Sequence, residues 1–130
     1  MSSFPHTVLI VDDSPQAAVN LEIALTTGPE FEVKIVASAR EALAVLNQAG
    51  CPVAAIITDL EMPRMNGYEL IETVRKNPKW ASTPIIVSSG SADPDAPARA
   101  QRLGANAYFA KPYSLMKLRK TLANLLEGTP

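Results

Sequence analysis

The chain has 130 residues, of which 47% are hydrophobic and 19% are charged, a composition typical of one globular domain with a single core. Its 12 basic and 13 acidic residues leave a formal net charge of −1, so the charge balance gives no general attraction to nucleic acid or to an anionic membrane. Apolar runs such as 53–57 are far shorter than the roughly 20 residues that span a bilayer.

Two further features indicate the compartment. The first seven residues lack the basic start and apolar middle of a secretion signal. The single cysteine, Cys51, cannot form an internal disulfide, which is typical of proteins in a reducing environment. We therefore expect one cytoplasmic domain over residues 1–130 that contacts neither nucleic acid nor membrane directly.

Short runs rich in valine and isoleucine alternate with longer amphipathic stretches along the whole chain. In chain order they predict a strand at about 7–11, a helix at 15–27, a strand at 33–37, a helix at 39–49, a strand at 53–58, a helix at 67–77, a strand at 84–89, a helix at 97–103, a strand at 106–110 and a helix at 114–127. Strict alternation of strand and helix predicts an α/β fold with five strands.

Helix start and stop signals support these boundaries. Ser38 precedes Glu41 by three residues, and Asn66 precedes Glu69 by the same interval, which is the spacing of a capping box. Gly128 follows the last predicted helix, as a C-terminal cap often does. The helices at 39–49, 67–77 and 114–127 thus have independent support.

Polar residues collect at the predicted strand ends. The runs at 8–11 and 53–57 show no polar alternation, which indicates strands buried on both faces in a parallel, doubly wound sheet. Ligands of such sheets bind beyond the carboxyl ends of the strands. There the sequence places five polar residues: Asp12, Asp13, Asp59, Ser89 and Lys111.

Three clustered carboxylates repel one another unless a cation or a raised pKa relieves them. Oxygen ligands without histidine or cysteine favour Mg²⁺, or Mn²⁺, over Zn²⁺. Mg²⁺ commonly joins protein carboxylates to phosphate oxygens, so the cluster indicates phosphoryl chemistry in which a carboxylate is the nucleophile. Lys111 and Ser89 would then bind phosphoryl oxygens.

Simpler explanations exist for single members of this set. Asp12 or Ser14 could cap the first helix, and Asp59 could cap the turn before the third. A flavin phosphate site on the same topology is disfavoured, because such a phosphate binds after the first strand, where Asp12 and Asp13 would repel it. The functional interpretation depends on all the residues meeting at one rim.

At this point the residues resemble a known family, the receiver domains of two-component response regulators, of which the chemotaxis regulators are examples. The resemblance covers about 7–127, which we expect to be the core of the domain. It depends on an ordered set of motifs, VLIVDD at 8–13, DLEMPRMNG at 59–67, PIIVSSG at 84–90, GA at 104–105 and YFAKP at 108–112. It implies a flavodoxin-like fold with strand order 2-1-3-4-5 and five flanking helices.

The resemblance also implies roles at the acidic rim. Asp59 matches the position of the phosphoacceptor. Asp12 and Asp13 match the metal-binding acids, with Asp13 the direct ligand. The backbone carbonyl of Glu61, two residues after the acceptor, matches the third protein ligand of Mg²⁺.

Further roles follow at the last two strands. Ser89 rather than its neighbour matches the hydroxyl that moves toward the phosphoryl group, because it lies five residues after Pro84 and just before a small residue. Lys111 matches the lysine that binds the phosphoryl group, and the resemblance implies a cis bond between it and Pro112. Tyr108 matches the aromatic residue whose rotamer follows that hydroxyl.

The implied function is a phosphoaspartate switch. A sensor histidine kinase, a histidine phosphotransfer protein or a small phosphodonor would supply the phosphoryl group, and the acyl phosphate would hydrolyse in the same site at a rate that depends partly on Glu61 and Ser91. The surface of the helix at 97–103, the strand at 106–110 and the helix at 114–127 would then bind a downstream partner or a second copy.

Several classes of protein remain open on the sequence. The chain could be a stand-alone receiver or phosphorelay shuttle, or a receiver excised from a larger regulator or hybrid kinase. A receiver that binds partners without phosphorylation is a further class. A true aspartyl-phosphate hydrolase would need a second acid two residues after the nucleophile, and Glu61 holds that position without the remainder of such an enzyme's motif. We therefore expect a signalling domain rather than an enzyme.

Overall fold

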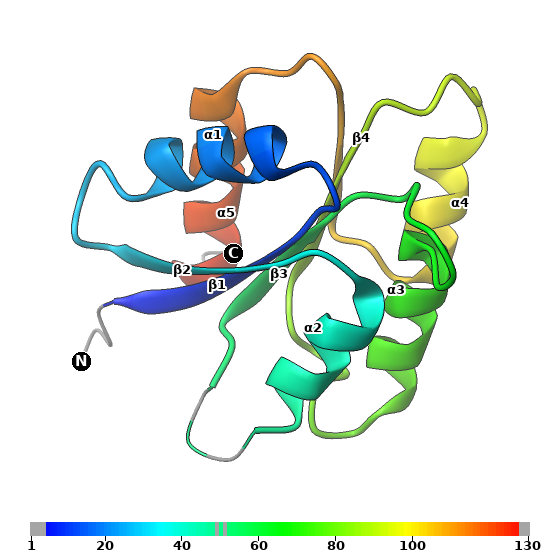
Figure 1. The fold of residues 1–130 in the computed structure, drawn as a ribbon, viewed down its shortest axis with the longest axis horizontal. Helices are drawn as coiled ribbons and strands as arrows, with labels where there is room; N and C mark the ends of the chain where they lie inside the picture. The colour runs from blue at the N-terminus through cyan, green and yellow to red at the C-terminus, as the bar shows by residue number, and fades with distance from the viewer. Residues whose placement is uncertain (1–4, 49, 51, 128–130) are drawn as a thin grey trace.

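The computed structural model describes residues 5–48, 50 and 52–127, so Cys51 and Gly128 lie outside the described part of the chain (Figure 1). Within that part, strand and helix alternate as predicted. The strands are β1 (His6–Val11), β2 (Phe31–Val36), β3 (Ala55–Thr58), β4 (Ile85–Ser89) and β5 (Ala107–Ala110). The helices are α1 (Pro15–Leu25), α2 (Ala39–Leu46), α3 (Gly67–Lys76), α4 (Ala96–Leu103) and α5 (Leu115–Glu127).

The strands form one 5-stranded sheet in the order β2-β1-β3-β4-β5. All four neighbouring pairs are parallel. The order reverses beside β1, whose two neighbours are β2 and β3. This confirms the predicted doubly wound sheet and puts the ends of β1 and β3 at the topological switch point, where such sheets bind ligands.

Helices cover both faces of the sheet (Figure 1). Leu9 and Val11 of β1 pack in a cluster with α2, α3 and α4, whereas Val8 and Ile10 pack in a second cluster with α1 and α5. Because successive side chains of a strand point to opposite faces, one apolar run serves both clusters. Among the described residues, no helix has the length and apolar character needed to cross a membrane.

The predicted helix starts are found in the structure. At α3, Asn66 Oδ1 accepts from Glu69 N at 2.9 Å and Glu69 Oε1 accepts from Asn66 N at 2.9 Å, which completes the capping box. At α2, Ser38 Oγ accepts from Glu41 N at 3.1 Å and donates to the Glu41 carboxylate at 3.0 Å. Here the glutamate binds the capping hydroxyl instead of the backbone.

Element boundaries differ from the predictions by a few residues. α1 ends at Leu25 rather than 27, where the hydroxyls of Thr26 and Thr27 donate to backbone carbonyls of the last turn. β2 begins at Phe31 rather than 33, because Phe31 pairs with His6 and enters the core under α1 and α5. β3 begins at Ala55 rather than 53, where its pairing with β1 starts.

Candidate functional site

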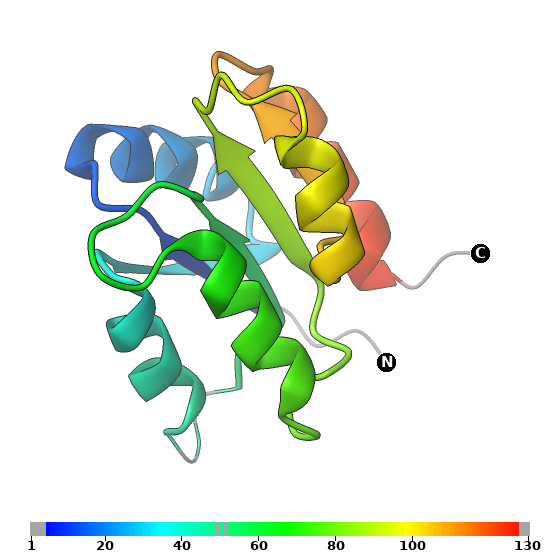
Figure 2. The same ribbon diagram turned by 90° about the vertical axis from the view of Figure 1, so that its right-hand side faces the viewer.

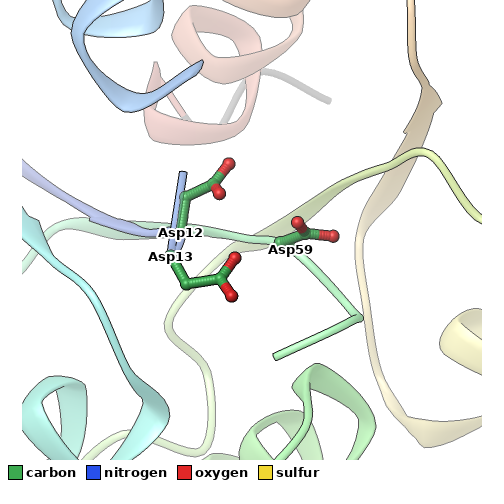
Figure 3. Close-up of side chains that lie close together, drawn as sticks. All are labelled: Asp12, Asp13 and Asp59. Atoms are coloured by element: carbon green, nitrogen blue, oxygen red, sulfur yellow. The ribbon is translucent and has the colours of Figure 1, made fainter. Parts of the chain in front are cut away.

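The carboxyl ends of β1 and β3 bring three aspartates together (Figure 3). Asp12 and Asp13 directly follow β1, and Asp59 follows β3. Asp12 and Asp59 still bind the neighbouring strands through their amides, which donate to Val36 O at 3.1 Å and Val11 O at 3.0 Å. One carboxylate oxygen from each aspartate lies within 4.8 Å of the other two. Asp12 and Asp59 are buried, while Asp13 is exposed.

Asp12 pairs with Lys111 and does not cap α1. Its Oδ1 accepts from Ser14 N at 2.9 Å, and Ser14 Oγ in turn accepts from Ala17 N at 3.4 Å as the N-cap of α1. Asp12 Oδ2 is the oxygen that accepts from Lys111 Nζ at 3.3 Å. The capping explanation therefore applies to Ser14, and Asp12 retains an oxygen for the site.

The two oxygens of Asp59 have different surroundings. Oδ1 accepts from the amides of Leu60 at 2.7 Å and Glu61 at 3.3 Å, so Asp59 also caps the turn that follows it. Oδ2 lies 3.6 Å from Lys111 Nζ. Burial raises the pKa of Asp59 above its usual value and the Asp12 charge adds to this, although Lys111 and the two amides oppose it.

Lys111 is the cation of the rim. Its amide donates to Ser89 O at 2.7 Å, which anchors the residue at the end of β4. Burial lowers the pKa of Lys111, but the charges of Asp59 and Asp12 more than offset this and leave the pKa above its usual value. The ammonium thus stays charged. The bond to Pro112 is cis, as the resemblance implied.

Ser88 and Ser89 lie on opposite faces of β4. Ser89 lies on the same face of β4 as Ile85 and Val87, which pack under α2, α3 and α4. Ser88 lies on the face of Ile86, which packs in the cluster with α1 and α5. The Ser89 side chain is fully buried, and its Oγ accepts from Ser91 N at 3.0 Å. The sheet therefore brings Ser89, at the end of β4, to the same rim as the aspartates.

Glu61 and Tyr108 lie further out. Glu61 is exposed, and its amide, as described, donates to Asp59. Tyr108 is half-buried beside the cluster under α4. Together with Pro97, Ala98 and Gln101 it lines a cleft of about 390 Å³ between α4 and β5.

Sequence reasoning missed two features of the loop after Asp59. Arg64 has a φ of 68°, in the left-handed region that side chains rarely adopt. Gly67 packs so closely that a Cβ atom there would lie 2.2 Å from Asp59 O. The approach of Gly67 to the backbone of Asp59 is a through-space contact, which residue spacing along the chain does not predict.

The donor chemistry of the cluster fits a divalent cation. All three side chains offer oxygen, which suits hard cations such as Mg²⁺ or Mn²⁺. The raised pKa of Asp59 reflects burial that a bound cation would offset. Asp12, Asp13 and Asp59 are thus the residues that could hold a metal ion.

Comparison with known proteins agrees with this geometry. The sequence model of one protein family, the response regulator receiver domain, matches residues 8–123 of this chain. Among curated proteins, the probable cyclic di-GMP phosphodiesterase of Vibrio cholerae is 32% identical over 122 residues, which are 94% of this chain but 27% of that protein. The probable chemotaxis protein CheY of Rhizobium etli is 29% identical over 115 residues, 88% of each chain. This chain therefore spans about a quarter of one relative and most of the other.

Solved structures give the same result. A response regulator from Chloroflexus aurantiacus superimposes with a TM-score of 0.87 at 35% identity, covering 95% of this chain and 98% of that one. The Mn²⁺-bound form of response regulator Rcp1 superimposes with a TM-score of 0.79 at 26% identity, covering 97% and 98%. Because the family model matches most of the chain, the protein belongs to the response regulator receiver domain family, whose members are phosphorylated on aspartate in two-component signalling.

Proposed function

We propose that this receiver domain accepts a phosphoryl group on Asp59, in a Mg²⁺ site formed with Asp12, Asp13 and the backbone carbonyl of Glu61. The observation that carries the proposal is the arrangement of charges at the rim. Three carboxylates lie within 4.8 Å, and Lys111 Nζ lies 3.3 Å from Asp12 and 3.6 Å from Asp59. A lone capping aspartate would need neither the other two acids nor a half-buried lysine.

Each residue then has a task in phosphoryl transfer. Asp59 Oδ2, which accepts no hydrogen bond from a backbone amide in the described part of the chain, attacks phosphorus in line, and the bond from phosphorus to the donor breaks with its electron pair leaving on the donor atom. Lys111 binds a phosphoryl oxygen as a point charge, and the Ser89 hydroxyl turns to donate to another. Mg²⁺, when bound, supplies positive charge that offsets both the acids and the phosphoryl oxygens.

We further propose that the donor is a sensor histidine kinase or a histidine phosphotransfer protein, with small phosphodonors as substitutes, and that the acyl phosphate hydrolyses in the same site. Phosphorylation would shift a two-state equilibrium through Ser89 and Tyr108 and change the surface of α4, β5 and α5. The cleft beside Tyr108 supports this as the surface for a downstream partner or a second copy.

We propose one receiver domain with its core at about 7–127, acting in the cytoplasm as a signalling domain rather than a turnover enzyme. The two curated relatives described above represent two possible contexts, a short regulator and a module of a longer protein. The test below applies to either context, because it uses only the residues of this chain.

The test is the intact mass of the protein after incubation with Mg²⁺ and acetyl phosphate or phosphoramidate. The wild type should gain about 80 Da, the mass of one phosphoryl group, in a form labile to hydroxylamine, as an acyl phosphate is. Asp59→Asn should gain nothing. Asp95→Asn is the matched control, because Asp95 is an exposed aspartate paired with Arg102, and it should behave as the wild type does.

Two outcomes would contradict the proposal. A gain that persists in Asp59→Asn would place the acceptor elsewhere. The absence of any gain, with Mg²⁺ binding verified and a histidine kinase also ineffective, would indicate a receiver that works without phosphorylation.

A further inference from the structure

The two edge strands of the sheet differ in their protection. β5 is 4 residues long, and α4 and α5 lie on either side of it (Figure 2). β2 is 6 residues long, contains neither proline nor glycine, and in the described part of the chain pairs with β1 alone. A long edge strand without proline or a bulge is a template for pairing with another strand. β2 is therefore the open edge of this sheet.

The side chains of β2 show that neither helix layer covers this edge. Glu32 and Lys34 lie on the same face as Val36, the side of α2, and both are exposed. Ile35 lies on the face of Phe31, the side of α1, and is 37% exposed. Figure 1 shows β2 between the layers that contain α1 and α2. Another strand can thus approach β2 without displacing a helix.

The backbone of β2 presents alternate residues to the open edge. Glu30 O and Val36 O accept from the amides at the two ends of β1, at 2.8 and 3.1 Å. Because the backbone groups of successive strand residues point to opposite sides, the even-numbered residues face β1. Phe31, Val33 and Ile35 therefore direct their N–H and C=O groups outward. These are the donors and acceptors that an added strand needs.

We propose that β2 pairs with β2 of a second copy of this chain, antiparallel and centred on Val33. In this register Val33 lies opposite the partner's Val33, and Phe31 lies opposite the partner's Ile35. All of these residues direct their backbone groups outward, so each opposed pair can exchange both hydrogen bonds of an antiparallel ladder. A two-fold axis relates the copies, and each presents the same strand to the other.

The charges of β2 favour a second copy as the occupant. With Val33 at the centre, Glu32 lies opposite the partner's Lys34, and Lys34 lies opposite the partner's Glu32, in the closer type of cross-strand pair. A register centred one residue earlier would put two glutamates opposite each other, and one centred one residue later would put two lysines together. Charged residues on an edge ordinarily oppose pairing with a foreign strand. Here their signs match the same sequence read in the opposite direction.

This interface is separate from the surface of α4, β5 and α5. β2 and β5 are opposite edges of the sheet, so pairing at β2 joins two receivers into one continuous sheet with a β5 strand at each outer edge. Phosphorylation of Asp59 is not required for it. We therefore expect the dimer to form in the unphosphorylated protein.

A charge-swap experiment tests the interface. In sedimentation equilibrium, the dimer fraction of the wild type should rise between about 10 µM and 1 mM, the range expected of a small interface. Lys34→Glu and Glu32→Lys, each measured alone, put like charges opposite each other and should weaken the dimer about tenfold or more. An equimolar mixture of the two variants should associate again, because every charge then faces its opposite.

Lys76→Glu is the matched control. It makes the same change in net charge on an exposed residue of α3, whose ion pair with Glu72 is 3.5 Å long, and it should dimerise as the wild type does. Asp59→Asn should also retain the dimer, which separates this interface from one that phosphorylation creates. The proposal is overturned by a wild type that stays monomeric, or by equal effects of Lys34→Glu and Lys76→Glu.

Amide exchange with solvent, measured by NMR, distinguishes strand pairing from other contacts between copies. As the concentration of the wild type rises, the amides of Val33 and Ile35 should exchange severalfold more slowly, because they gain acceptors on the partner. The amide of Lys34 faces β1 and is the internal control. Slower exchange only outside residues 31–35 would place the contact elsewhere and refute pairing at β2.

Discussion

Asp59 combines burial with incomplete neutralisation. Two amides bind its Oδ1, whereas among the described residues the cation that pairs with Oδ2 is Lys111 Nζ, at 3.6 Å, which also pairs with Asp12. The pKa of Asp59 is raised because burial weakens solvation of the carboxylate. A residue kept in such surroundings reduces stability and gains reactivity, a combination found at functional sites.

Arg64 offers a test of stored backbone strain in the same loop. At a φ of 68°, an L-residue with a long side chain is disfavoured, whereas asparagine tolerates this region. We expect Arg64→Asn to raise the free energy of unfolding by about 1 kcal/mol. Urea unfolding of both proteins measures this. Arg64→Ala is the control, since alanine removes the guanidinium without relieving the backbone, and an equal gain from alanine would show that strain is not the cause.

At the scale of elements, Arg75 ties the end of α3 to two loops. Its guanidinium donates to Gly104 O at 3.0 and 2.8 Å, to Ala81 O and Thr83 O at 3.1 and 2.7 Å, and to Asn106 Oδ1 at 2.9 Å. Asn106 Oδ1 also accepts from Ile85 N, at the start of β4. One side chain therefore organises the edge of the sheet opposite the acidic rim.

Removal of this side chain should leave several partly buried carbonyls without donors. We expect Arg75→Ala to lower the free energy of unfolding by about 2–4 kcal/mol, and Arg75→Lys to recover less than half of that, because an ammonium cannot reproduce the planar fork. Lys76→Ala is the control on the next residue, whose exposed pair with Glu72 at 3.5 Å should contribute at most about 0.5 kcal/mol. Equal losses at the two positions would refute the role of Arg75.

The contact between α3 and α4 predicts a pH dependence. Arg99 lies 3.9 Å from the ring centroid of Tyr68, and burial raises the pKa of Tyr68 above its usual value, against the effect of the Arg99 charge. The folded protein therefore holds this phenol proton more tightly than the unfolded chain does. This difference adds to the free energy of unfolding below the usual pKa of tyrosine. The contribution is lost as pH rises through the pKa of Tyr68 in the folded protein.

Tyr68→Phe distinguishes the contribution of the hydroxyl group from that of the aromatic ring. The variant keeps an aromatic ring over which Arg99 can lie, but it has no proton to lose. From about pH 9 to pH 11 the free energy of unfolding should fall more steeply in the wild type than in the variant. Denaturant titrations at several pH values measure how the free energy of unfolding of each protein changes with pH. An equal decrease in both proteins would show that ionisation of Tyr68 does not reduce stability.

The whole molecule creates the acidic rim by its topology. Asp12 and Asp59 are far apart in sequence, yet β1 and β3 pair in parallel, Val11 beside Thr58, so both residues emerge at one edge. Lys111 reaches the same edge from the far side of the sheet, after β5. The site is therefore formed only when the sheet is complete.

On the proposed function, Mg²⁺ would bind the folded protein alone, because its site forms only when the sheet is complete. We expect Mg²⁺ to raise the melting temperature, EDTA to reverse the change, and the stabilisation to approach about 2.7 kcal/mol at a hundredfold excess over the dissociation constant. Asp13→Asn should abolish most of this response, whereas Asp95→Asn should retain it. An undiminished response in Asp13→Asn would remove Asp13 from the metal site.

Much of this protein could be inferred from sequence, because the signals are local. Strands follow from short continuous apolar runs, helices follow from the longer amphipathic stretches between them, and the capping box at Asn66 follows from two residues three apart. The β-α alternation then implies a parallel sheet, and a parallel sheet sends the residues after its strands to one edge. The sequence alone thus predicts that Asp12, Asp13, Asp59 and Lys111 lie together.

Other features depend on contacts between distant segments, and only the tertiary structure decided them. It set which oxygen of Asp59 faces Lys111, how closely Gly67 approaches the backbone of Asp59, and where β2 begins. The physical reason is common to all of these: each depends on a through-space distance, which local periodicity and residue spacing along the chain do not encode.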